Sequence, residues 1–193
     1  MSETTRPFLT IVSGAPRSGT SLMMRMLEAG GIPPLTDAIR AADRDNPNGY
    51  YEFEPVKKLR EDTSWVAGSV GKAVKMVYVL LRDLPPGTEY RVLLMRRRLE
   101  EVVASQNKML ERLGRPSAGL SEQRMIDMFR AQLDETERWL TGRPGFSHMV
   151  VDYNALVADP LTHVPALDAF LGGGLDCAAM CTTVDPDLYR NRA

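Results

Sequence analysis

Eight residues near the N-terminus, Gly14 to Ser21, have the types and spacing needed to bind a phosphate or sulfate group. An apolar run, Phe8 to Val12, precedes them and a helical pattern of methionine and leucine follows, so the order is strand, tight loop, helix. The loop amides and the positive end of the helix dipole then converge on one point, which suits a dianion. Gly14 and Gly19 let the backbone wrap closely around that anion. Further hydroxyl donors come from Ser18, Thr20 and Ser21.

The spacing of the loop is that of a P-loop, G-x-x-x-x-G-K-[ST], with one change. The lysine position holds Thr20, and the cation has moved into the loop as Arg17. Nucleoside triphosphatases use the lysine to bridge the β- and γ-phosphates, so its loss argues against ordinary ATP chemistry. A guanidinium inside the anion loop can instead stabilise charge on a leaving oxygen, which makes Arg17 the candidate electrophilic catalyst.

A second set of polar residues follows the apolar run Arg91 to Met95, which predicts a buried strand. If a helix begins near Leu99, Arg97 lies at the strand tip and Ser105 about two turns into the helix. Pro16-Arg17-Ser18-Gly19-Thr20-Ser21 resembles the 5′-phosphosulfate loop of sulfotransferases that use 3′-phosphoadenosine 5′-phosphosulfate (PAPS). Arg97 and Ser105 have the spacing of the family's pair for the 3′-phosphate, with Glu101-Val102-Val103 as its acidic and aliphatic filling.

The resemblance implies a site for PAPS and its product, adenosine 3′,5′-bisphosphate, with no metal required. Its donor-binding residues would be Gly14, Ala15, Pro16, Arg17, Ser18, Gly19, Thr20, Ser21, Arg97, Ser105 and, from the tail, Arg190 or Arg192. The family's glycine- and lysine-rich loop near that tail is absent. The segment Val151 to Pro160 resembles a late strand–helix junction, but Tyr153-Asn154 lacks the usual glutamate, and we expect this piece to serve packing. Asn46-Pro-x-Gly-Tyr-Tyr-Glu52 is similar to the small bacterial members.

A sulfotransferase also needs a base for the acceptor, which the resemblance implies to be a small molecule with a hydroxyl or amine. Glu52 is the candidate catalytic base, because Tyr50, Tyr51 and Phe53 beside it could shield its carboxylate from water, and Glu54 is its rival. Either could instead cap a helix or pair with a cation. His148 and His163 read as structural or exposed, His148 because it would open a buried strand at the end away from the site. Lys75 could reach the donor or acceptor, or it and Lys72 could be solvated edge residues.

Two other functions compete with sulfate transfer. Met149-Val150-Val151-Asp152 has the pattern of a Walker B strand, so a P-loop kinase or nucleotide-binding protein could hold Mg²⁺ at Asp152. A non-catalytic relative that binds adenosine 3′,5′-bisphosphate is the other alternative, because the base is weakly defined and the tail is modified.

Alternating strands and helices must position these residues. The sequence predicts strands over 73–79, 91–95 and 148–152 besides the first, and helices over 21–29, 37–43, 55–62, 99–113 and 160–171, with Ser121 capping another long helix. This pattern predicts an α/β fold, a P-loop NTPase-like three-layer sandwich with a central parallel sheet flanked by helices. Ligands of such sheets bind beyond the carboxyl ends of the strands, where the separate motifs would converge.

Length and composition bound the remaining possibilities. At 193 residues the chain fits a single α/β domain, residues 1–193, and its net charge of −1 provides no general attraction for nucleic acid or an anionic membrane. An 18-residue apolar run and a signal-peptide layout are both missing, so we expect no membrane partner and a cytoplasmic location. Cys177 and Cys181 lack a second pair and read as free thiols rather than zinc ligands. The acceptor and the oligomeric state cannot be read from the sequence.

Overall fold

A four-stranded parallel sheet forms the centre of the computed structural model, which describes residues 7–37, 49–112, 114 and 119–185. Its strands lie in the order β2-β1-β3-β4. Each pairs with its neighbour in parallel. The strands are β1 (Leu9–Gly14), β2 (Ala73–Val77), β3 (Tyr90–Arg96) and β4 (Phe146–Asp152). The predicted parallel sheet is therefore confirmed.

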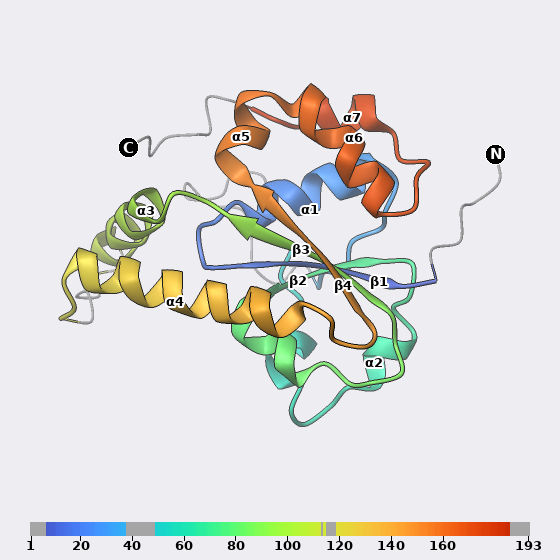
Figure 1. The fold of residues 1–193 in the computed structure, drawn as a ribbon, viewed down its shortest axis with the longest axis horizontal. Helices are drawn as coiled ribbons and strands as arrows, with labels where there is room; N and C mark the ends of the chain where they lie inside the picture. The colour runs from blue at the N-terminus through green and yellow to red at the C-terminus, as the bar shows by residue number, and fades with distance from the viewer. Residues whose placement is uncertain (1–6, 38–48, 113, 115–118, 186–193) are drawn as a thin grey trace.

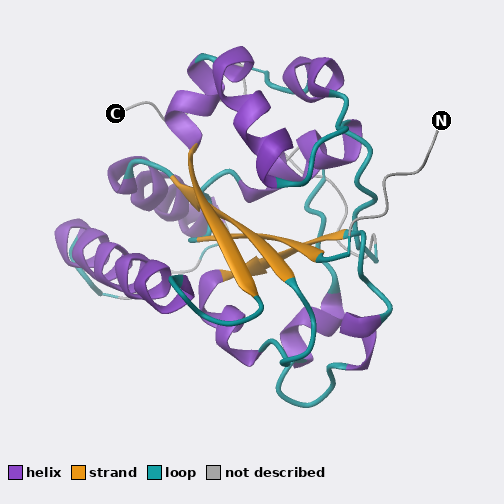
Figure 2. Cartoon of the chain, turned by 45° about the vertical axis from the view of Figure 1, so that its right-hand side comes forward, coloured by secondary structure: helices purple, strands orange, loops and turns teal. Residues whose placement is uncertain are grey.

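Helices cover both faces of the sheet, which gives the three layers that the sequence predicts (Figures 1 and 2). One layer contains α1 (Thr20–Ala29), α5 (Tyr153–Ala158), α6 (Pro160–Phe170) and α7 (Cys177–Thr182). The other contains α2 (Ser64–Ala67), α3 (Leu99–Arg112), α4 (Glu122–Leu140) and two 3₁₀ segments, η1 (Glu54–Lys58) and η2 (Tyr78–Asp83). No helix within the described ranges has the length and apolar content needed to span a membrane.

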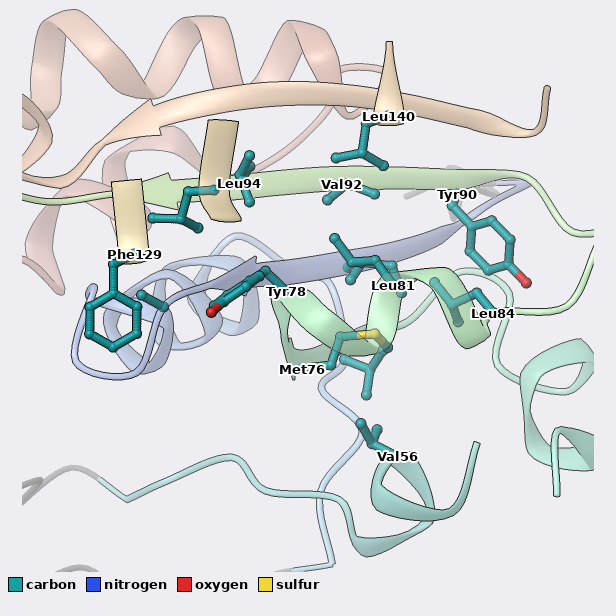
Figure 3. Packing of buried hydrophobic residues seen from close by; sticks show 14 of the residues in the cluster. Val56, Met76, Tyr78, Leu81, Leu84, Tyr90, Val92, Leu94, Phe129 and Leu140 are labelled. Carbon is teal, nitrogen blue, oxygen red and sulfur yellow. The ribbon is translucent and has the colours of Figure 1, made fainter. Parts of the chain in front are cut away.

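The strand residues divide between two cores because successive side chains point to opposite faces of a sheet. In β3, Val92 and Leu94 join the core on the α3–α4 side, whereas Leu93 and Met95 join the core on the α1 side. Figure 3 shows Val92 and Leu94 in the first of these cores, with Tyr78, Leu81, Phe129 and Leu140. Both faces of the central strands are apolar, as expected for a parallel sheet that helices cover on both sides.

The strand register aligns the carboxyl ends of the four strands at one edge. Gly14, the last residue of β1, pairs with Val77 of β2 and with Met95 of β3. Arg96 at the end of β3 pairs with Asp152 at the end of β4. The loop after β1 and the segments after β3 and β4 consequently leave the sheet side by side, where parallel sheets bind their ligands.

Some sequence expectations need correction. The helix predicted over 55–62 is a 3₁₀ segment, Glu54–Lys58, followed by a turn. The strand of His148 is an edge strand rather than a buried one, because among the described residues β4 pairs with β3 alone, and Val150 is 41% exposed. Helix α5 starts directly after β4, where no separate helix was expected. Apart from Asp37, the helix expected over 37–43 lies outside the described residues.

Most of the other expected elements are confirmed, although the strand expected over 73–79 ends at Val77 and a 3₁₀ segment begins at Tyr78. The long helix α4 begins as predicted, because the Ser121 hydroxyl accepts a hydrogen bond from the Arg124 amide. A cap of this kind satisfies one of the four unpaired amides of the first turn. Helix α4 buries Met125, Phe129, Leu133 and Leu140 against the sheet, and Met128 is partly exposed.

Candidate functional site

The loop between β1 and α1 is tightly folded, and two glycines permit this. A Cβ on Gly14 would lie 2.8 Å from the Met95 carbonyl oxygen of the neighbouring strand, too close for any other residue. Gly19 has a φ of 93° and begins α1 as its N-cap, and the Ser18 amide donates to the Ala15 carbonyl at 3.2 Å. A backbone φ in this range suits glycine and strains most other residues. The loop therefore has the glycine-dependent turn that the sequence predicts.

Arg17 stands out within the loop, because it is a non-glycine residue with a φ of 68°. A left-handed conformation of this kind costs on the order of 1 kcal/mol or more and persists where surrounding contacts hold it. Two contacts do so here: Arg17 Nε donates to Ser105 Oγ at 2.9 Å, and the Arg17 carbonyl accepts from Arg97 Nη1 at 3.2 Å. The structure thus brings together Arg17, Arg97 and Ser105, three residues that are up to 88 positions apart in sequence.

The hydroxyls of Ser18 and Ser21 in the loop have different surroundings. Ser18 Oγ is buried and, within the residues that the structure describes, has no hydrogen-bond partner. A buried hydroxyl without a partner is costly, and an anion in the loop would satisfy it. Ser21 Oγ lies 3.4 Å from Nζ of Lys75, which reaches over from β2 and also donates to the Tyr50 carbonyl. Lys75 therefore places a cation beside the loop, although Thr20 occupies the lysine position of a P-loop.

The second anchor contains a buried ion pair. Arg97 follows β3, its side chain is 9% exposed, and its Nε donates to Glu101 Oε2 at 2.8 Å. The Glu101 side chain is fully buried. Its other oxygen, Oε1, accepts from Asn154 Nδ2 at 3.1 Å. Asn154 Oδ1 in turn accepts from the Arg98 amide, also at 3.1 Å. Residues after β3 and β4 are thereby joined around one carboxylate.

Tyr153 joins this group to the loop. The Arg97 guanidinium carbon lies 4.7 Å from the centre of the Tyr153 ring. The same ring packs so closely on Gly19 that a Cβ there would collide with it. Tyr153 is 7% exposed, so α5 starts in contact with both the loop and Arg97. Tyr153 and Asn154, which we expect to serve packing more than chemistry, both lie at the candidate site.

Sequence reasoning treated Glu101 as filling and missed its contact with Arg97. A signal was present, since Arg97, Glu101 and Ser105 are spaced four residues apart, which places them on one side of a helix or its approach. Asn154 carried a weaker signal, because it follows a strand whose end lies at the ligand-binding edge of the sheet.

A hollow of about 500 Å³ opens beside these residues. Its lining combines three arginines with polar and small residues: Arg96, Arg97, Arg98, Asp152, Asn154, Ala155 and Ala158. Asp152 caps α5, as its Oδ1 accepts from the Ala155 amide at 3.0 Å. Among the residues that the structure describes, no three His, Cys, Asp or Glu side chains form a cluster able to hold a metal ion. Asp152 thus lies among arginines rather than in a carboxylate cluster.

The candidate base lies in the segment that Lys75 links to the loop. The Glu52 carboxylate is 24% exposed and lies 3.8 Å from Lys57 Nζ, and Glu54 pairs with the same lysine. Tyr50 is buried, whereas the Phe53 ring packs on Trp65, 5.3 Å between centres. Arg190, Arg192 and the Asn46–Asn48 part of the bacterial motif lie outside the described residues. His148 and His163 are half-buried, on β4 and α6.

Tyr51 links the segment that contains Glu52 to α1, and its contact predicts that the stability of the protein depends on pH. Its hydroxyl donates to Glu28 Oε2 at 2.5 Å. Burial and the neighbouring Glu28 charge raise the pKa of Tyr51 from 10 to about 12. Because the folded state holds the Tyr51 proton more tightly than the unfolded state, protonated Tyr51 contributes its full stabilisation below pH 10. This contribution is lost as the pH rises towards 12. We expect the free energy of unfolding, measured by urea titration, to fall more steeply from pH 10 to 12 in the native protein than in Tyr51→Phe; parallel curves would contradict this.

Comparisons with known proteins identify the fold. No family model and no curated protein match the sequence. The structure is similar to a sulfotransferase domain from the curacin biosynthetic pathway, with a TM-score of 0.55 and 15% identity over 96% of this chain and 80% of that one. A sulfotransferase domain of the Synechococcus PCC 7002 olefin synthase gives 0.49 and 16% identity, covering 100% and 86%. A sugar kinase from Janibacter sp. HTCC2649 gives 0.42 and 17% identity, covering 84% and 97%. At these identities the similarity concerns the fold.

Proposed function

We propose that this chain is a sulfotransferase that moves a sulfuryl group from PAPS to a hydroxyl or amine of a small-molecule acceptor. The observation that carries the proposal is the contact of Arg17 with both Arg97 and Ser105 at the carboxyl edge of the sheet. One anion loop and one additional arginine–serine pair, side by side, fit a ligand with two separate anionic groups. ATP has one phosphate chain and would not need the second pair.

The loop residues suit the end of the donor that carries the 5′-phosphosulfate. The amides of Gly14 to Ser21, the unsatisfied Ser18 hydroxyl and the start of α1 would bind its oxygens. Arg97 and Ser105 would hold the 3′-phosphate. A guanidinium has five N–H donors. In Arg97, one donor bonds to Glu101 and another bonds to the Arg17 carbonyl. The Ser105 hydroxyl accepts from Arg17 and has its own proton to donate.

The transfer breaks the bond between sulfur and the bridging oxygen of the 5′-phosphate and forms one between sulfur and the acceptor oxygen or nitrogen. Arg17 stabilises the negative charge that develops on the leaving oxygen, and Lys75 adds a second positive charge beside the loop. Glu52 is the base proposed to take the acceptor proton, and the contact of Lys75 with the Tyr50 carbonyl supports this by holding its segment near the loop.

Isothermal titration calorimetry with nucleotides tests the proposal. We expect adenosine 3′,5′-bisphosphate to bind the native protein at least tenfold more tightly than 5′-AMP, since only the bisphosphate reaches both anion subsites. Equal affinities for the two nucleotides, or preferential magnesium-dependent binding and hydrolysis of ATP, would overturn it in favour of a kinase or nucleotidase. Bisphosphate binding without sulfate transfer to a broad acceptor library would support the non-catalytic alternative.

A further inference from the structure

We propose that Glu101 is a positioning residue that holds the donor loop in its binding conformation through Arg97. The identity of the ligand in the loop rests on the proposed function. The effect of Glu101 on the conformation of the loop does not, because it operates in the protein without ligand. Glu101 bonds to Arg97, and Arg97 bonds to the Arg17 carbonyl in the loop. It acts on Arg97, and Arg97 acts on the backbone of Arg17.

The first step is the burial of the Glu101 carboxylate. A fully buried carboxylate is strongly unfavourable unless cations and hydrogen bonds compensate it. Arg97 Nε bonds to one oxygen and Asn154 Nδ2 to the other, while Arg98 Nη1 approaches within 3.8 Å. These contacts fix the carboxylate in one orientation, and the charged hydrogen bond fixes the Arg97 side chain in turn.

The second step is the contact between Arg97 and the loop. Because its Nε bonds to Glu101 and its central carbon lies 4.7 Å from the centre of the Tyr153 ring, the Arg97 guanidinium has little freedom to rotate. Its Nη1 then points at the Arg17 carbonyl and bonds to it at 3.2 Å. That carbonyl belongs to the residue with a φ of 68°, so the bond stabilises the strained conformation at the centre of the anion loop. Without Glu101, Arg97 could turn away and the loop would relax.

The contact between Glu101 and Asn154 provides a specific test, because an amide donates to a carboxylate across it. Glu101→Gln leaves an oxygen for Arg97 but turns an amide towards the Asn154 amide, so two donors face each other. Adding Asn154→Asp restores a donor and an acceptor, now exchanged between the two positions. The carboxylate introduced by Asn154→Asp has a second oxygen for the Arg98 amide, which bonds to Asn154 Oδ1 in the native protein.

Hydrogen exchange of the ligand-free protein, followed by mass spectrometry, measures the loop directly. We expect Glu101→Gln to speed exchange about tenfold in peptides covering residues 14–21, because the variant loses one charged hydrogen bond. Exchange in α6 should be unchanged. Glu101→Gln with Asn154→Asp should return the loop to within about threefold of the native rate. Asn154→Ala, which removes one bond from the carboxylate, should give a smaller increase. Glu100→Gln, the exposed neighbour on α3, is the matched control and should change nothing.

The outcomes separate this inference from the proposed function. Unchanged loop exchange in Glu101→Gln, an equal increase in α6, or a double variant no slower than the single one would overturn the positioning role, whatever the protein binds. If Glu101→Gln does not fold, unaltered loop exchange in Asn154→Ala would overturn it. In calorimetry we expect Glu101→Gln to weaken adenosine 3′,5′-bisphosphate about tenfold and the double variant to recover most of that affinity. Failure of the native protein to bind the bisphosphate counts against the proposed function alone.

Discussion

Arg17→Ala is expected to lower kcat for sulfate transfer from PAPS by a factor on the order of 10²–10³, which is typical when one preorganised charge-stabilising donor is removed. Arg17 lies inside the anion loop, where it can face the leaving oxygen, and Ser105 and Arg97 hold it there. The measurement is transfer of radioactive sulfate to an acceptor found by library screening. Binding of adenosine 3′,5′-bisphosphate should weaken less than kcat falls, because the loop amides remain.

Arg17→Lys and Arg130→Ala complete this experiment. Lysine keeps the charge but lacks both the Nε–H that bonds to Ser105 and the further donors of the planar guanidinium, so we expect Arg17→Lys to recover only part of the rate. Arg130 is an exposed arginine paired with Asp127 on α4, and its removal should leave kcat within a factor of about two. If Arg17→Ala retains native kcat, Arg17 is not the electrophilic catalyst.

Arg97→Met is expected to lower the free energy of unfolding by about 3–5 kcal/mol, which is the usual cost of removing one partner of a buried ion pair. Glu101 would then keep its charge in a fully buried position without the Arg97 guanidinium, while Asn154 Nδ2 still donates to its Oε1. Removing that charge as well, in Arg97→Met with Glu101→Gln, should recover a substantial part of the loss. Urea denaturation of the ligand-free protein measures both variants.

Arg91→Met is the matched control, because Arg91 lies near the opposite end of the same strand, away from the candidate site. Arg91 bonds to the Phe170 carbonyl and stacks on Phe8 at 4.0 Å, so its loss removes a hydrogen bond and a cation–π contact. We expect a cost of about 1–2 kcal/mol and unchanged nucleotide binding. Equal losses for Arg91→Met and Arg97→Met, or no recovery in the double variant, would show that the Glu101 charge is not the cause.

The central part of the fold could be predicted from the sequence because its signals are local. The apolar run before Gly14, the glycines of the loop and the helical pattern after it fall within one short stretch, Phe8 to Leu27. The same holds for the strand before Arg97 and for the Ser121 cap. Parallel strands end at one edge, and that rule predicts that the loop at Gly14 and the residues after Met95 lie along one rim.

Other parts of the site depend on contacts between distant segments and could not be predicted. Asn154 and Glu101 are 53 residues apart, and nothing in either segment shows that an amide will meet a carboxylate. The left-handed conformation of Arg17 goes against the ordinary preference of arginine, and its carbonyl accepts a hydrogen bond from Arg97, which lies outside the loop. The edge position of β4 likewise follows from sheet order, which alternating strands and helices do not determine.

A crystal structure grown with adenosine 3′,5′-bisphosphate tests the two-anion site most directly. We expect the 5′-phosphate over the amides of Gly14 to Ser21 with Ser18 Oγ donating to it, and the 3′-phosphate bonded to Ser105 and Arg97. A bisphosphate bound elsewhere, or one whose 3′-phosphate projects into solvent with Arg97 and Ser105 uninvolved, would contradict the assignment of this edge of the sheet as a sulfate-donor site.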